Sequence, residues 1–135
     1  MPFDYHQKVL FKHCDPAGIV FYPRYFEMIN DATEAFFDEA LGCPWEILHE
    51  TANIPTVEIT TRFSAPSRHG DALIIRLEVT RLGRSSLGLR FQATCGGETR
   101  FVANSTLVRI AKTGRPEPWP DNLRTKITSF LGDTA

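Results

Sequence analysis

The chain has 135 residues, of which 42% are hydrophobic and 23% are charged, a composition that excludes intrinsic disorder. A chain of this length buries roughly two thirds of its unfolded surface in one core, so we expect a single domain over residues 1–135. Lysine and arginine number 15 against 16 acidic residues, and no stretch approaches the roughly 20 apolar residues of a membrane span, which argues against nucleic acid and membranes as partners.

The N-terminal part of the chain predicts a strand, a turn and a long helix. Residues 6–12 favour a first strand, and the turn-forming segment 13–18 follows them. From Pro23 to Leu41 apolar residues recur at helical spacing over a wide arc, with acidic residues on the opposite side. Proline is typical of a helix start, and Gly42 is typical of a helix stop. An arc this wide predicts a helix that is covered on several sides.

Beyond residue 56 the apolar period changes from about 3.6 residues to 2, which is typical of antiparallel strands with one buried face. We expect four long strands, over 57–65, 73–80, 87–95 and 99–110. Short turns at 83–84 and 96–97 suit hairpins, and helices are predicted over 44–49 and 121–131. The predicted fold class is therefore α+β, with antiparallel strands curling around one long helix.

The predicted helix is too apolar for a single protomer. One curved sheet of this size cannot fully cover such a helix and also close its own edges. We therefore expect a homo-oligomer, either a dimer or a tetramer.

The cysteines and the first residues of the chain indicate in which cellular compartment the protein is expected. Cys14, Cys43 and Cys95 are far apart, form no CxxC pattern and are odd in number, so neither a disulfide framework nor a metal site is predicted. The first residues lack the basic and apolar parts of a signal peptide, and we expect a cytoplasmic protein. Cys14 lies beside Asp15, but no recognisable motif places His and Asn or Asp partners for a nucleophilic thiol, so we interpret it as a small residue that is buried or half-buried.

The segment 13–25, HCDPAGIVFYPRY, carries the chemistry. Its turn places the carboxylate of Asp15 near the unsatisfied N–H groups at the start of the helix. Those N–H groups and the helix dipole suit a developing oxyanion, and a nearby carboxylate can act on an acyl group as nucleophile or base. In an isolated Asp-Pro-x-Gly sequence, however, the aspartate is more often a turn former, and the residues alone leave both roles open.

The same segment closely resembles the active-site signature of the 4-hydroxybenzoyl-CoA thioesterase family of hotdog enzymes. The matching positions are Asp15, Ala17, Gly18, Ile19, Val20 and Tyr22. Segments 63–71 and 81–87 also resemble features of this family, so the resemblance covers nearly the whole chain. It implies a hotdog fold, hydrolysis of an acyl-CoA thioester without metal or cofactor, and a tetramer built from two dimers.

The resemblance assigns roles to individual residues. It implies that Asp15 is the catalytic carboxylate and that the backbone N–H of Tyr22 polarises the thioester carbonyl. An acyl-enzyme anhydride at this carboxylate and general-base attack by water both remain open. Arg84, followed by Ser85, matches the place where the family binds the phosphates of coenzyme A. Tyr25 is a candidate for the wall of the acyl pocket, with core packing as its alternative role.

Two positions depart from the hydroxybenzoyl enzyme. Asn30 stands where that enzyme has an aspartate for the phenolic hydroxyl, and Ile54 stands where a threonine is expected. We therefore expect an aromatic acyl group, benzoyl or hydroxybenzoyl in type, without a strong requirement for the para-hydroxyl.

Three alternatives belong to the same fold. A short-chain or aliphatic acyl-CoA thioesterase of the Tol-Pal-associated type usually has His at the position of Pro23. A non-catalytic module that binds acyl thioesters would have no use for a carboxylate at Asp15. A hotdog dehydratase needs a His and an acidic partner in a different helix motif, which the sequence lacks.

Overall fold

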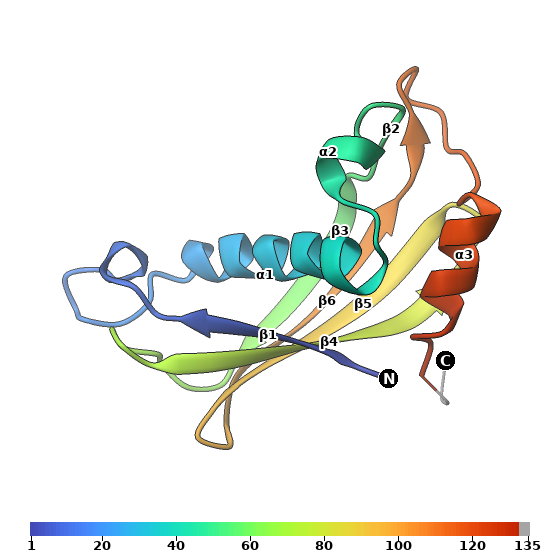
Figure 1. Ribbon diagram of the computed structural model, residues 1–135. Coiled ribbons are helices and arrows are strands. Elements are labelled where there is room, and N and C mark those ends of the chain that lie inside the picture. The colour runs from blue at the N-terminus through green and yellow to red at the C-terminus, as the bar shows by residue number, and fades with distance from the viewer. Residues whose placement is uncertain (133–135) are drawn as a thin grey trace.

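The computed structural model describes residues 1–132, which form a curved antiparallel sheet with one long helix lying along it (Figure 1). Five strands build the sheet in the order β1-β4-β5-β6-β3. Their bounds are Phe3–Lys8 for β1, Thr56–Phe63 for β3, Ala72–Leu82 for β4, Ser86–Cys95 for β5 and Glu98–Val108 for β6. Two short strands, β2 at Ala52–Asn53 and β7 at Ile110–Ala111, pair separately. The α+β class predicted from the sequence is confirmed.

The long helix begins at Pro23, as predicted, and winds regularly through α1, Pro23–Ala35. It continues as a π-helical turn, η2, over Phe36–Ala40, after which the Leu41 N–H donates to the Phe36 carbonyl at 3.1 Å. Gly42 ends the helix with a φ of 61°, a left-handed conformation that glycine adopts without strain.

The apolar period does not predict the π-helical turn, and packing explains it. Phe36 and Phe37 are consecutive, yet both side chains are completely buried. The Phe36 ring contacts the Phe3 ring with centroids 5.7 Å apart, whereas the Phe37 ring contacts Trp119 at 6.4 Å. A turn with one extra residue directs two neighbouring side chains into the core, which a regular α-helical turn does less readily.

The bounds predicted for the first strand, residues 6–12, are wrong. Residues 3–8 pair with residues 72–77 of β4, so the strand begins and ends earlier. The N–H of Val9 then bonds the loop before β4, and Phe11–His13 form a 3-10 turn, η1. The reason is the length of the partner: β4 begins opposite the end of β1, and the alternating residues beyond that point have no ladder to join.

Strands β4, β5 and β6 each bury one face, as their alternating residues predict. The same prediction is wrong for β3 within one protomer, because Val57 is 60%, Ile59 is 38% and Phe63 is 45% exposed. β3 is an edge strand, whereas the long helix packs closest to β1 and β4 near the other edge. The uncovered apolar strand is compatible with the expected homo-oligomer, which stays a prediction.

The remaining elements lie where the sequence places them. Helix α2 spans Trp45–Leu48 and helix α3 spans Asp121–Thr128, inside the two predicted helical segments. Gly96 and Gly97 link β5 to β6 with φ values of 56° and 83°, the two left-handed positions that a tight hairpin turn requires. Among the described residues, no helix is both long and apolar enough to cross a membrane.

Candidate active site

Residues 13–21 of the signature segment fold into a narrow loop ahead of α1, which we call the Asp15 loop. The Asp15 N–H donates to the Ile19 carbonyl at 3.0 Å, and the Phe21 N–H donates to the His13 carbonyl at 2.9 Å. Gly18 closes the loop with a φ of 80°, a conformation that side chains strongly disfavour. The loop therefore brings Asp15 and the start of the helix into one small structural unit.

The carboxylate of Asp15 takes part in this turn and keeps a free oxygen. Its Oδ1 accepts the Ala17 N–H at 2.9 Å, which is the turn-forming role that the sequence left open. The residue is half-buried, and its Oδ2 accepts no hydrogen bond from the described residues. A carboxylate held by one oxygen, with the other unpaired, is fixed in direction and still available for chemistry.

The start of α1 provides an unpaired donor. Pro23 has no N–H, and the Tyr22 N–H finds no acceptor among the described residues. The next N–H groups are satisfied, since Arg24 donates to the Phe21 carbonyl at 2.8 Å and Tyr25 donates to the Tyr22 carbonyl at 3.0 Å. The Tyr22 N–H is thus the group at this helix end that is free to bind an oxygen atom.

An open hollow of about 550 Å³ lies beside this donor. Tyr22 and Tyr25 both line it, together with Phe63 from the end of β3. The Tyr25 ring is only 4% exposed and stacks on Phe63 with centroids 5.7 Å apart. The structure therefore brings two predicted site residues together, and Tyr25 also serves as a core residue.

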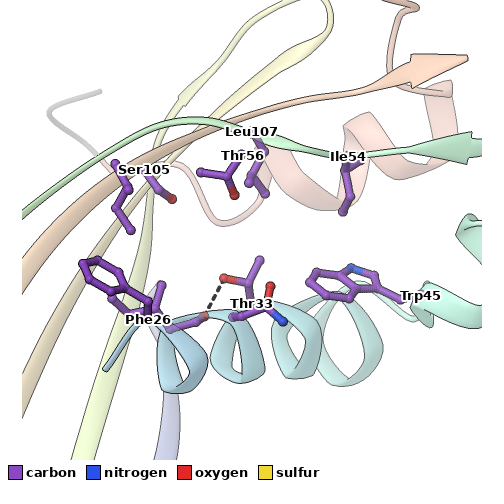
Figure 2. A pocket seen from close by; sticks show the side chains of 10 residues that line it. Phe26, Thr33, Trp45, Ile54, Thr56, Ser105 and Leu107 are labelled. Atoms are coloured by element: carbon purple, nitrogen blue, oxygen red, sulfur yellow. Dashed lines mark hydrogen bonds between the residues drawn. The ribbon is translucent and has the colours of Figure 1, made fainter. Parts of the chain in front are cut away.

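A second cavity, of about 260 Å³, lies farther along the helix between α1 and the strands β3 and β6. It is lined by Phe26, Ile29, Asn30, Thr33, Trp45, Ile54, Thr56, Ile59, Ser105 and Leu107. Figure 2 shows Thr33 and Trp45 on its helical side and Ile54 on the opposite side. Asn30 and Ile54, the two positions that depart from the hydroxybenzoyl enzyme, face this one cavity.

Sequence reasoning missed four polar residues in this cavity: Thr33, Trp45, Thr56 and Ser105. Thr33 lies almost one helical turn beyond Asn30, so helical spacing could have identified it. Its hydroxyl donates to the Ile29 carbonyl at 2.8 Å, which leaves its oxygen as an acceptor toward the cavity. No local sequence pattern identifies the other three, which reach the cavity only through the tertiary fold.

Arg84 and Ser85 lie in the turn between β4 and β5, far from the Asp15 loop (Figure 1). The Asp15 loop bonds to the segment just before β4, whereas the turn follows the end of β4. The 11 residues of this strand span about 36 Å at roughly 3.3 Å each. Arg84 is exposed, and its carbonyl accepts N–H groups from Trp119 and Arg124 at 3.1 and 2.9 Å, so the turn is firmly held.

The buried side chain of His13 holds the start of the Asp15 loop through a hydrogen bond. It is 4% exposed, and its Nδ1 accepts the Leu10 N–H at 2.9 Å. Burial lowers the pKa of this imidazole, which favours the neutral form whose Nδ1 accepts the Leu10 N–H. Within residues 1–132, no three His, Cys, Asp or Glu side chains gather closely enough to hold a metal ion.

The profile of the thioesterase-like superfamily matches residues 9–127. The chain is 26% identical over 110 residues to a 4-hydroxybenzoyl-CoA thioesterase from Pseudomonas sp. (strain CBS-3), covering 77% of this chain and 78% of that protein. It is 22% identical over 125 residues to a 1,4-dihydroxy-2-naphthoyl-CoA hydrolase from Synechocystis sp., covering 87% and 91%.

A solved structure also resembles this chain, and it too is a thioesterase. A gentisyl-coenzyme A thioesterase superposes with a TM-score of 0.85 at 30% identity, covering 93% of this chain and 99% of that one. The predicted hotdog fold and the thioesterase class are thereby confirmed. On the match over residues 9–127, the chain belongs to the thioesterase-like superfamily.

Proposed function

We propose that this thioesterase hydrolyses aromatic acyl-CoA thioesters, with Asp15 as the catalytic carboxylate and the Tyr22 N–H as the donor to the thioester carbonyl. The observation that carries the proposal is that one short segment presents two polar groups without a hydrogen-bond partner among the described residues: an Asp15 carboxylate oxygen and the Tyr22 N–H. Attack on a thioester places negative charge on the carbonyl oxygen, which an N–H at a helix start stabilises. The carboxylate either attacks the carbonyl carbon or takes the proton from an attacking water.

The cavity beside Asn30 supports an aromatic acyl group. Apolar cavities of about 150 Å³ hold benzene, and this one has about 260 Å³, enough for a substituted ring. Phe26, Ile29 and Leu107 give it apolar walls. The relatives described above are named for hydroxybenzoyl, dihydroxynaphthoyl and gentisyl thioesters, which are all aromatic.

The residues at the departing positions support a relaxed preference for the ring substituent. An amide such as that of Asn30 both donates and accepts, so it tolerates a hydroxyl without requiring one. Ile54 offers no hydrogen bond at all. A benzoyl group and a hydroxybenzoyl group are therefore both suitable occupants.

One observation favours the aliphatic alternative. A further hollow of about 470 Å³ continues from the cavity and shares Asn30, Trp45, Ile54 and Thr56 with it. A flexible alkyl chain is able to fill both spaces, whereas a single ring fills only the first.

Arg84 and Ser85 enter the proposal through a second copy of the chain. They follow the end of β4, whose 11 residues span about 36 Å at roughly 3.3 Å each, whereas the Asp15 loop of the same protomer contacts the segment before its start. We propose that they bind coenzyme A phosphates for a site whose Asp15 belongs to another protomer. The exposed apolar residues of β3 supply a surface on which such a homo-oligomer, dimer or tetramer, is able to form.

The test is a panel of benzoyl, 4-hydroxybenzoyl, phenylacetyl and straight-chain acyl-CoA thioesters, with release of free coenzyme A measured for each. We expect kcat/KM for benzoyl-CoA to exceed that for the best straight-chain substrate by at least about tenfold, the range in which pocket fit discriminates. A straight-chain substrate that is hydrolysed faster than every aromatic one contradicts the aromatic assignment.

A further inference from the structure

A half-buried arginine outside the signature segment donates to several groups of a neighbouring segment. Arg100, near the start of β6, has a side chain that is 12% exposed. Its NH1 donates to the Pro66 carbonyl at 3.1 Å, to Ser67 Oγ at 3.2 Å and to Asp71 Oδ2 at 2.7 Å. Its Nε lies 2.9 Å from a Glu98 carboxylate oxygen, as an ion pair without hydrogen-bond geometry. Arg100 thereby ties β6 to the segment 66–71.

Asp71 completes this arrangement. Its Oδ2 also accepts the Arg68 N–H at 2.9 Å, and its carbonyl accepts the Val9 N–H at 2.8 Å. The Arg68 N–H and then the Arg100 guanidinium lower the pKa of the Asp71 carboxyl. The carboxylate is therefore charged at neutral pH, and the Arg100–Asp71 pair is intact under the conditions of catalysis.

The segment 66–71, which Arg100 contacts, is in turn hydrogen-bonded to the Asp15 loop. The carbonyl of Ser67, a completely buried residue, accepts the Val20 N–H at 2.9 Å. Next to it, Arg68 forms an antiparallel bridge with Ile19, whose carbonyl accepts the Asp15 N–H. The other bond described above, from Phe21 to His13, joins two residues of the signature segment itself and does not anchor that segment to the sheet. One connection from Asp15 to the sheet thus runs through Ser67 to the Arg100 side chain, in addition to the backbone bonds from Ser64 to Arg100 and from Gly70 to Val9.

We infer that Arg100, paired with Asp71, is a positioning residue that fixes the Asp15 loop relative to the Tyr22 N–H. The inference rests on the proposed function, since it assigns Arg100 an effect through Asp15. The carboxylate and the N–H must act on one carbonyl group, and a displacement of about 1 Å in such an arrangement reduces turnover by about 100-fold. A lysine cannot replace the arginine fully, because NH1 alone contacts all three acceptors and lies one bond farther along the side chain than a lysine nitrogen does.

The test compares Arg100→Met with Arg76→Met. Arg76 is a matched control: it pairs with Asp4 through two contacts of 2.9 and 3.1 Å, but its side chain is 53% exposed. We expect Arg100→Met to lower kcat by about 30- to 100-fold with KM within about threefold. Arg76→Met should stay within about twofold, as is usual for exposed ion pairs.

Hydrogen exchange at the Val20 N–H provides a readout that does not depend on activity. Loss of the Arg100 bonds should speed this exchange by about tenfold or more, while Arg76→Met leaves it unchanged. If Arg100→Met folds poorly, Arg100→Lys keeps the charge and should still lower kcat by about tenfold with normal melting.

Repeating Arg100→Met in the Asp15→Asn background separates the inference from the proposed function. If Arg100 acts through Asp15, the second substitution lowers the residual rate no further. An equal fall in both backgrounds overturns the positioning role, as does unchanged Val20 exchange with kcat within about threefold of wild type. Failure of the proposed function shows separately, as an active Asp15→Asn variant.

Discussion

Replacing Asp15 by Asn and by Ala separates its proposed catalytic role from its role in the turn. Oδ1 of Asp15 accepts the Ala17 N–H at 2.9 Å. Asn offers an oxygen of the same shape and keeps this bond, but it lacks the negative charge, whereas Ala lacks both. If the carboxylate is nucleophile or base, both variants should lose about 10²- to 10⁴-fold in kcat.

The structure also predicts the change in stability. Ala removes one partly exposed hydrogen bond, which contributes about 1 kcal/mol. For a chain of 135 residues the entropy of unfolding is about 0.28 kcal/mol per kelvin, so Ala should lower Tm by about 4 °C. Asn should change Tm by less than about 1 °C, because the turn keeps its bond.

The assay is thiol release from benzoyl-CoA at saturating substrate, with thermal melting measured on the same preparations. Asp38→Asn, which changes an exposed carboxylate on η2, is the matched control and should leave both quantities unchanged. A turn former alone predicts the opposite pattern, in which Asn is active and Ala loses activity in step with its stability. An Asn variant that melts like wild type and turns over within about tenfold of it refutes the catalytic role.

The remaining predictions concern binding, specificity, pH and assembly. Arg84→Ala should raise KM for an acyl-CoA several-fold more than it lowers kcat and leave a pantetheine thioester unaffected; equal effects on both substrates contradict the phosphate contact. With Asn30 in the cavity, kcat/KM for 4-hydroxybenzoyl-CoA should exceed kcat/KM for benzoyl-CoA by far less than the roughly 10⁴-fold that a site built to bind a hydroxyl shows. Because burial lowers the pKa of His13 below its ordinary 6.5, the unfolded chain takes up this proton first, and Tm should fall as pH drops below about 6.5, less steeply in His13→Gln. Ile59→Lys on the exposed edge strand should shift the light-scattering mass toward the monomer; a wild-type protein that is already monomeric at micromolar concentration excludes the expected oligomer.

Local patterns in the sequence predict much of this protein. The helix that begins at Pro23 can be predicted from the sequence, because its apolar spacing and its first proline are both patterns within a few residues. The glycine pair at 96–97 is readable because two consecutive left-handed positions suit almost no other residue. The signature segment indicates the thioesterase class through its resemblance to a known family, and this resemblance is visible in the sequence because one continuous segment carries both Asp15 and Tyr22.

Other features depend on contacts between segments that are distant in the chain, and only the tertiary structure decides them. An alternating strand shows which side is apolar, but not what covers it, and β3 is left exposed because the helix lies nearer the other edge of the sheet. The separation of Arg84 from Asp15 follows from the length and direction of β4. The cavity that joins Asn30 to Ile54, and the bonds from Arg100 to the segment beneath the active-site loop, arise because the folded sheet places separate segments side by side, which no local pattern records.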